Sequence, residues 1–182
     1  MTADQTPGLA ARLAETACVR GAFTLPDGTV LDAYFDEYRL AADPGLLHDV
    51  AVAMASLIPT ETEVLAGLAL GGVPLAVALS AATGLPAAFL RRRAKCYGSK
   101  RQVEGIALEG KRVVLVDDVV RSGDQLLAAT RVLRIAGAKV TDALCVLERP
   151  SRGRQRLAEH RITLNPLLAE ADLPVPATEA VS

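Results

Sequence analysis

The stretch Val113–Gly123, which reads VVLVDDVVRSG, constrains the fold more than any other part of the chain. Its first four residues are apolar, so they predict a strand that is buried on both faces, as in a parallel sheet. Two adjacent carboxylates, Asp117 and Asp118, end this run, and a small-residue turn and an apolar helix pattern follow. Because open α/β sheets bind ligands at the carboxyl ends of their strands, we expect a site at these acids.

The residues at this point suit a phosphorylated sugar. Carboxylates accept hydrogen bonds from sugar hydroxyls, while the free N–H groups and the dipole of a helix N-terminus suit a phosphate. The alternative is a strand that ends in solvated acids, with Arg121–Asp124 forming an ordinary N-cap turn, since short motifs also occur without function.

The rest of the chain alternates strand and helix patterns. This alternation predicts an α/β fold, a mostly parallel twisted sheet flanked by helices, without a linker that would divide it. Pro26-Asp27-Gly28 predicts a turn between two short extended segments. We expect strands at 64–70, 86–90, 113–116, 140–147 and 162–164, and helices at 9–19, 43–57, 74–82, 124–136 and 151–158. The Pro-rich residues 173–182 carry no core pattern and are expected to be a disordered tail, which leaves residues 1–172 as a single domain.

Composition narrows the classes of function. A net charge of −1 gives no global field for nucleic acid or an anionic membrane, and no apolar run is long enough to span a bilayer. The three cysteines are odd in number and form no CxxC pair, which favours reduced thiols in the cytoplasm. Walker A, GxGxxG, HExxH and GxSxG sequences do not occur.

Three further segments carry candidate chemistry. Arg91–Gly105 holds six cations within eleven residues and no apolar period, so it predicts an exposed loop that closes over a polyanion, or else a solvated surface loop. Gly71-Gly72 lets backbone N–H groups approach an anion, or is an ordinary turn. Arg149 could bind a carboxylate with its two-pronged guanidinium, although a lone arginine is usually a surface residue.

Together these motifs resemble a known family. The stretch Val113–Gly123 resembles the PRPP-binding signature of type I phosphoribosyltransferases, where PRPP is 5-phosphoribosyl 1-pyrophosphate. The cationic loop resembles the catalytic loop of orotate phosphoribosyltransferases, in which Arg-Lys-x-x-Lys-x-His/Tyr-Gly precedes Glu-Gly. The corresponding residues are Arg91, Arg92 in place of the usual Lys, Lys95, Tyr97, Gly98, Glu104 and Gly105.

This resemblance implies a Mg²⁺-dependent transfer from PRPP to a pyrimidine base, orotate in the first place. It implies catalytic roles for Lys95, Asp117 and Asp118, with the two acids on the ribose hydroxyls and Lys95 on the departing pyrophosphate. Residues 1–40 would form a hood over the base, and the loop Arg91–Glu104 would be shared across the subunits of a homodimer. Magnesium would be held mainly by PRPP and water rather than by a cage of protein ligands. The implied PRPP-binding set is Gly71, Gly72, Arg91, Arg92, Lys95, Tyr97, Asp117, Asp118, Val119, Val120, Arg121, Ser122, Gly123, Asp124 and Gln125, and the implied base-binding set is Tyr34, Phe35 and Arg149.

The chain departs from the family pattern at two places. Pro26 and Asp27 stand where the family carries Lys and Ser, and Arg121 and Gln125 stand where its phosphate turn has Thr and Ser or Thr. Asp124 adds a negative charge beside the expected anion, which costs affinity unless its side chain points away. Two alternatives therefore stay open: a paralogue that uses another base or acceptor, and a PRPP- or nucleotide-binding regulator without turnover.

Overall fold

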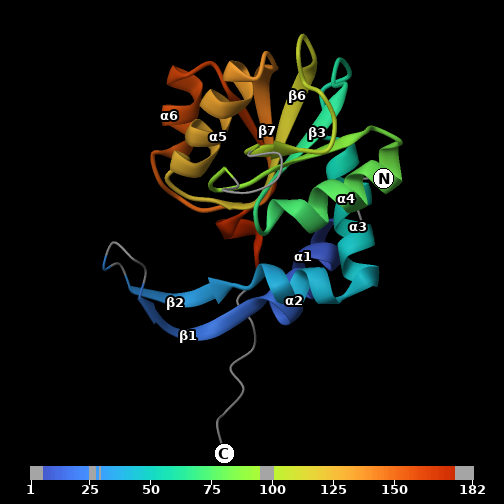
Figure 1. Cartoon of the computed structure of the whole chain (residues 1–182). Helices are drawn as coiled ribbons and strands as arrows, with labels where there is room; N and C mark the ends of the chain where they lie inside the picture. The colour runs from blue at the N-terminus through green and yellow to red at the C-terminus, as the bar shows by residue number, and fades with distance from the viewer. Residues whose placement is uncertain (1–5, 25–27, 29, 95–100, 175–182) are drawn as a thin grey trace, which may run out of the picture.

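A six-stranded sheet forms the centre of the molecule (Figure 1). The structure is a computed structural model that describes residues 6–24, 28, 30–94 and 101–174. The strand order is β5-β4-β3-β6-β7-β8, and all neighbours are parallel except β4 and β5. The α/β fold predicted from the sequence is thereby confirmed. The strands are β3 (Val64–Leu68), β4 (Ala87–Leu90), β5 (Val103–Glu104), β6 (Arg112–Val120), β7 (Lys139–Glu148) and β8 (Thr163–Ala169).

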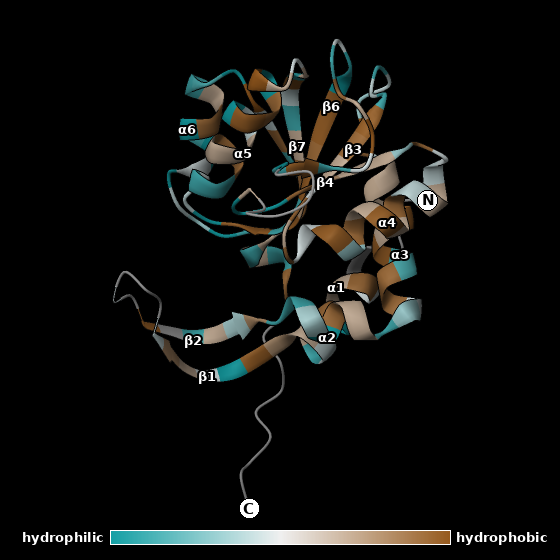
Figure 2. Cartoon of the chain, viewed as in Figure 1, coloured by the Kyte–Doolittle hydropathy of each residue, from teal (hydrophilic) through white to brown (hydrophobic). Residues whose placement is uncertain are grey.

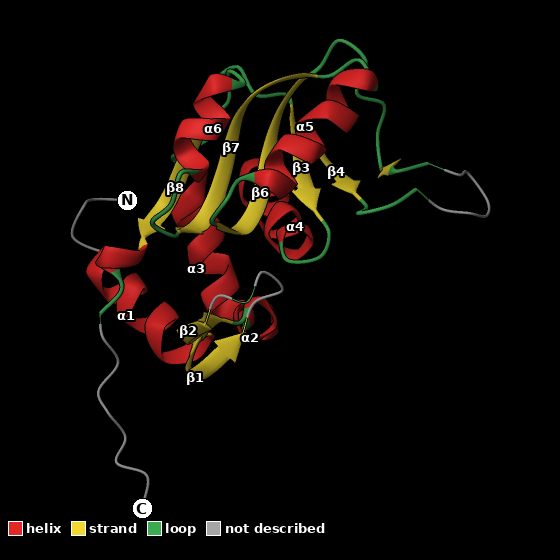
Figure 3. Cartoon of the chain, turned by 90° about the vertical axis from the view of Figure 1, so that its left-hand side faces the viewer, coloured by secondary structure: helices red, strands yellow, loops and turns green. Residues whose placement is uncertain are grey.

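Helices cover both faces of this sheet, as Figure 3 shows from the side. On one face the apolar side chains of the first helices pack with those of α4, and on the other face those of α5 pack with α6. Figure 2 shows that β3 and β6, which lie between these layers, are largely apolar, as is much of α4. The helices are α1 (Thr6–Ala17), α2 (Glu37–Ala42), α3 (Pro44–Ala55), α4 (Gly72–Thr83), α5 (Asp124–Ile135) and α6 (Gly153–Glu159), with a short 3₁₀ turn, η1 (Glu170–Asp172).

Strand β6 lies at the centre of the sheet and is longer than the sequence suggested. The expected strand stopped at Val116, but β6 continues through Val120, so Asp117 and Asp118 lie inside the strand and not after it. Pairing explains the difference: β3 accompanies β6 only as far as Val116, whereas β7 accompanies it to Val120. Beyond Val116 one edge of β6 is therefore open, and the two acids lie on this open segment.

The N-terminal region forms a separate antiparallel hairpin, β1 (Cys18–Thr24) and β2 (Val30–Phe35), which lies beside α1 and α2 and apart from the large sheet (Figures 1 and 3). The turn predicted between these strands falls largely outside the described residues. Helix α2 was not expected, although its start has a clear cause: the carboxylate of Asp36 accepts hydrogen bonds from the N–H groups of Tyr38 and Arg39.

Other boundaries also differ from the expectation. The helix expected at 9–19 ends at Ala17, because Cys18 and Val19 pair with β2 as the start of β1, and the strand expected at 64–70 ends at Leu68. The cationic segment was expected to be loop throughout, but Val103–Glu104 forms the edge strand β5 against β4. Strand β8 extends from the expected 162–164 to Ala169 because its full length pairs with β7. The tail from 175 onward lies outside the described residues. Among the described helices, none is long and apolar enough to cross a membrane.

Gly67 tests the packing of β3 against α4. A Cβ at this position would lie 2.5 Å from the carbonyl oxygen of Gly72 and 2.8 Å from the Cβ of Ala76. We expect Gly67→Ala to lower the free energy of unfolding by about 1–3 kcal/mol, because the helix must move away from the strand. Gly8→Ala is the matched control, since Gly8 lies in α1 with nothing within 4 Å of its built Cβ. It should raise stability by about 0.5–1 kcal/mol. Equal Tm shifts for both variants in thermal denaturation would contradict this account.

Candidate active site

A crevice of about 240 Å³ opens where β3, β6 and β7 end, and the hairpin residue Tyr34 borders it. It collects residues from five separate parts of the sequence. Ten of the candidate site residues border it, namely Tyr34, Phe35, Gly71, Arg92, Asp117, Asp118, Val119, Arg121, Gln125 and Arg149. The sugar-binding and base-binding candidates therefore lie together in one crevice.

The Gly-Gly turn lies directly against the open edge of β6. A Cβ on Gly72 would lie 2.1 Å from the carbonyl oxygen of Val116, and one on Gly71 would lie 2.5 Å from the carboxyl carbon of Asp118. Only glycine fits at these two positions without movement, although the backbone of Gly71 has ordinary helical angles. Glycine is required here because the backbone of the turn approaches β6 closely. This close approach places the start of α4 beside the paired acids.

Asp117 and Asp118 differ in their surroundings. Asp117 is 6% exposed, and its Oδ1 accepts the N–H of Asp118 at 3.1 Å. Burial, followed by the charge of neighbouring Asp118, raises the pKa of Asp117 well above its ordinary value. Asp118 is half-buried and borders the crevice. One carboxyl is thus held inside the strand and the other is more open to a ligand.

The turn between β6 and α5 leaves the helix N-terminus without a side-chain cap. Gly123 is the N-cap residue and has a φ of 75°, in the left-handed region that favours glycine. Ser122, Gly123 and Asp124 form this turn, while Val120 before it is buried in the core. Open N–H groups at a helix start provide an anion site.

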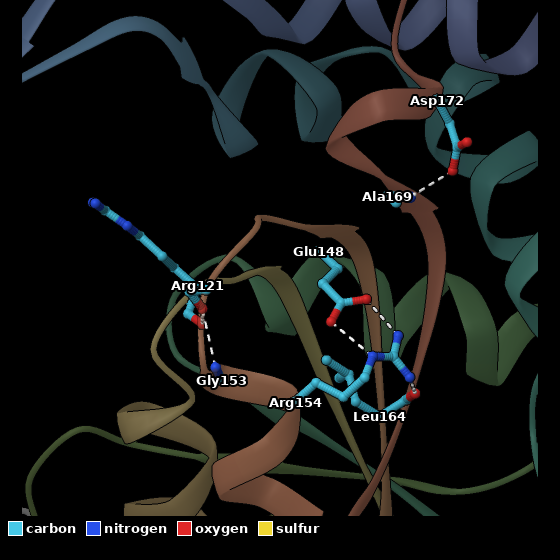
Figure 4. Close-up of polar contacts among 8 residues, drawn as sticks. Arg121, Glu148, Gly153, Arg154, Leu164, Ala169 and Asp172 are labelled. Atoms are coloured by element: carbon cyan, nitrogen blue, oxygen red, sulfur yellow. Dashed lines mark hydrogen bonds and ion pairs between the residues drawn. The ribbon is translucent and has the colours of Figure 1, made fainter.

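Arg121 borders the crevice with a side chain that the sequence left unassigned. Its backbone lies next to Gly153, and Figure 4 shows its side chain running away from Gly153 and from the Glu148–Arg154 ion pair. Its Nη1 atom is buried and has no hydrogen-bond partner within the described chain. Buried guanidinium groups are normally paired, so this atom is available to an anionic ligand.

The described part of the cationic loop begins at the crevice. Arg92 borders it, and its Nε donates to the carbonyl oxygen of Ala69 at 3.3 Å. Next to the crevice lies an apolar cavity of about 310 Å³. It shares Arg92 and Gln125 with the crevice and is also lined by Arg91. Lys95 and Tyr97 lie outside the described residues.

The base half of the site contains one exposed ring and one buried ring. Phe35 is 3% exposed and packs in the core, whereas Tyr34 is 36% exposed, with its ring centroid 5.5 Å from that of Phe23. Burial, then the nearby Glu37 that accepts its hydroxyl at 3.2 Å, raises the pKa of Tyr34. Of the two aromatic candidates, Tyr34 is therefore the one with a ring face open to a ligand.

Arg149 is already engaged by the protein. Its guanidinium pairs with Glu170 of η1 and donates to the carbonyl oxygen of Ala33 in β2 at 3.2 Å. The side chain is 12% exposed and borders the crevice. Arg149 thus connects the end of β7 to the hairpin, a structural role that no pattern in the sequence indicated.

Two residues that border the crevice were not expected, Glu37 and Leu70. Glu37 follows the cap residue Asp36 and has no distinctive spacing, and Leu70 reads as the end of the apolar run of β3. Only their position in the fold identifies them. Within the described chain, no group of three or more His, Cys, Asp or Glu side chains is arranged to hold a metal ion.

The buried state of Asp117 has a consequence for the pH dependence of stability. Because its pKa is raised, the native state holds this proton where the unfolded state has lost it, so the free energy of unfolding falls as pH rises from about 4 through the native pKa. In the absence of ligand, we expect the Tm of Asp117→Asn to rise relative to that of the wild type as the pH is raised from 4 to 8.

Glu63→Gln is a control in which the stability difference from the wild type should change with pH for the opposite reason, a lowered pKa. Hydrogen bonds from the Arg112 backbone N–H and from Lys111 lower the pKa of Glu63, so its contribution is present at neutral pH and is lost as pH falls. We expect this variant to be less stable than the wild type at pH 7, with the difference closing toward pH 4. If the Tm of Asp117→Asn kept a constant offset from the wild type, the burial argument would be wrong.

Comparisons with known proteins agree with this geometry. The phosphoribosyl transferase domain family matches residues 39–167. The chain is 42% identical over 173 residues to the orotate phosphoribosyltransferase of Nocardioides sp., covering 95% of this chain and 96% of the relative. It is 40% identical over 153 residues to that of Halobacterium salinarum, covering 84% and 87%.

Solved structures give the same result. Mycobacterium tuberculosis orotate phosphoribosyltransferase superposes with a TM-score of 0.83 at 27% identity, over 94% of this chain and 99% of that one. The enzyme from Aeropyrum pernix has a TM-score of 0.79 at 30% identity, over 91% and 95%. With the fold, the paired acids and the relatives in agreement, the chain belongs to the orotate phosphoribosyltransferase family.

Proposed function

We propose that this protein joins orotate to the ribose of PRPP, giving orotidine 5′-phosphate and pyrophosphate in pyrimidine nucleotide biosynthesis. One observation supports this most: the paired acids of β6, the Gly-Gly turn and the uncapped start of α5 border or adjoin a single crevice. A sugar that carries a 5′-phosphate and a 1-pyrophosphate needs these three features together. The named relatives are orotate phosphoribosyltransferases, which points to orotate as the base.

Each feature has a distinct part in the proposed reaction. Asp117 and Asp118 accept hydrogen bonds from the ribose 2′- and 3′-hydroxyls, and the turn Arg121–Gln125 holds the 5′-phosphate through backbone N–H groups. The Gly71-Gly72 turn and Arg92 face the pyrophosphate. Holding both ends of the sugar fixes the anomeric carbon while the bond to pyrophosphate breaks. Acids near the ribose also favour the positive charge that develops on the ring as pyrophosphate leaves.

Magnesium is part of the proposal. The donors present suit it, since Asp118 offers a half-buried carboxylate at the crevice and a phosphate-bound Mg²⁺ takes few protein ligands. When bound, the ion supplies positive charge to the pyrophosphate oxygens. Lys95 and the loop cations are proposed to add to this charge. The cytoplasmic location, the single domain over residues 1–172 and the hood role of residues 1–40 also stay predictions.

The decisive assay follows the loss of orotate absorbance when purified protein is mixed with orotate, PRPP and Mg²⁺. Turnover with orotate supports the proposal, and turnover with another pyrimidine would favour a paralogue with a different acceptor. Binding of PRPP without turnover on any base would favour a regulator. Pro26, which replaces a cation of the family pattern, is the reason to screen bases beyond orotate.

Arg121 is proposed to add a side-chain cation to the phosphate site. Its buried, unpartnered Nη1 at the crevice supports this role. We expect Arg121→Ala to raise the KM for PRPP by about 10- to 100-fold, the scale of a lost charge-assisted hydrogen bond, with less effect on kcat. Arg131→Ala is the matched control, because Arg131 is an exposed cation on α5 away from the crevice. Equal KM values for wild type and Arg121→Ala would show that the side chain contributes nothing.

The loop and dimer proposals are tested together through Lys95. We expect Lys95→Ala to lower kcat by about 10- to 1,000-fold, because charge develops on the leaving group only as the bond breaks. If the loop acts on the neighbouring subunit, mixing Lys95→Ala with Asp118→Asn protein should restore activity, since one site in a mixed dimer has both groups intact. Unchanged activity in Lys95→Ala would reject the loop assignment, and no recovery on mixing would reject sharing between subunits.

A further inference from the structure

The backbone of the phosphate turn is held from behind by the segment that leads into α6. The carbonyl oxygen of Val120 accepts the N–H of Arg149 at 2.9 Å, and that of Arg121 accepts the hydroxyl of Ser151. The carbonyl oxygen of Ser122 accepts Nη1 of Arg156 at 2.9 Å. Three consecutive carbonyl groups thus have partners in the stretch 149–156.

This arrangement sets the direction of the N–H groups. In a planar trans peptide the C=O and the following N–H point in opposite directions. With the carbonyls of Val120, Arg121 and Ser122 directed at the stretch 149–156, the N–H groups of the next three residues point to the opposite side. Within the described chain, no acceptor is recorded for the N–H groups of Ser122 and Gly123. The turn is therefore a preformed concave set of donors.

Close packing makes the α6 segment a fixed support. A Cβ on Gly153 would lie 2.0 Å from the carbonyl oxygen of Arg121, so the start of α6 touches the turn without room for a side chain. The hydroxyl of Ser151 also accepts the N–H of Gly153 at 3.0 Å, and Figure 4 shows Gly153 beside Arg121. The turn and the start of α6 are therefore packed directly against each other.

Arg156 has a second contact that concerns charge. Its Nη2 lies 2.5 Å from Oδ1 of Asp124, the acid that the sequence places in the anion site. A carboxylate in the first turn of a helix is attracted to free N–H groups and would compete with a bound phosphate. The ion pair holds this carboxylate on the α6 side, and the hydrogen bond from Arg156 lowers the pKa of Asp124.

The pair contributes little to folding, because both side chains are well exposed, 40% for Arg156 and 63% for Asp124. The ion pair therefore matters for where it holds the Asp124 carboxylate, behind the turn, and not for the stability of the fold.

We infer that Arg156 is a positioning residue for the phosphate site, which acts by keeping the Asp124 carboxylate away from the open N–H groups of the turn. The inference rests on the proposed function, since it assigns the anion to that same turn. Arg156 and Asp124 both lie outside the reacting centre. Their ion pair explains how the chain accommodates an acid at a position where its charge would otherwise oppose the substrate.

Calorimetric titration with Mg²⁺-PRPP tests this inference. We expect Arg156→Gln to weaken binding about tenfold, the scale of one unbalanced charge close to an anion, while Tm changes little. Adding Asp124→Asn to that variant should return the Kd to within about twofold of the wild type, because the competing charge is gone. This recovery separates a charge effect from general damage to the turn.

Arg152→Gln is the matched control. Arg152 is the exposed N-cap residue of α6 and forms no ion pair within the described chain. The substitution Arg152→Gln therefore removes the same charge from the same segment. Its Kd should stay within about twofold of the wild type, as expected for a screened surface charge. An unchanged Kd in Arg156→Gln, or a double variant as weak as the single one, would overturn the inference.

Inorganic phosphate, titrated in parallel, separates this inference from the proposed function. A wild type that binds phosphate but not PRPP would reject the proposed function, and the same four proteins would then test Arg156 with phosphate. A wild type that binds neither ligand would overturn both.

Discussion

The contact between the Gly71-Gly72 turn and β6 is the interaction on which the site depends. Strand β3 leaves β6 after Val116, and the chain returns at once as a glycine turn that touches Val116 and Asp118. Because neither glycine carries a Cβ, the backbone that would face a pyrophosphate and the acids that would hold a ribose are only a few ångströms apart. Every other part of the crevice is arranged around this contact, including the start of α4 and the cation of Arg92, which is tied to Ala69.

The acids beside this contact have an electrostatic cost. Asp117 and Asp118 are consecutive residues at the centre of the sheet, and Asp117 is almost fully buried. Such a pair opposes ionisation, and the raised pKa of Asp117 is the direct result. Sugar hydroxyls bound at this crevice would supply hydrogen-bond donors to these carboxyl groups. Burial thus favours the neutral form of Asp117, whereas the proposed binding of sugar hydroxyls favours the charged form. This conflict lies at the place where function is expected.

The sequence predicted most of the fold because the buried strands have uniform apolar runs and the helices have clear starts. It failed where pairing partners decide the outcome. The apolar run predicts a strand to Val116, but only the neighbour β7 extends that strand through the acids to Val120. Glu37 and Leu70 could not be found in advance, because their place at the crevice depends on α2 and on the direction of the chain after β3. The tie from Arg149 to Ala33 joins residues that are 116 positions apart, and no local pattern encodes it.

The departures of this chain from its family pattern have a common physical logic. At the phosphate turn, Asp124 adds a negative charge, Arg156 neutralises it from behind, and Arg121 brings a cation to the front. The cations of Arg121 and Arg156 thus offset the charge of Asp124, which alone would oppose an anion. At the base end, Arg149 is bound to both Glu170 and the hairpin, so its guanidinium can meet a base only in the orientation that these partners fix. In the proposed base-binding role of Arg149, the position of the hairpin would therefore influence which base fits, even through residues of β2 that do not touch the base.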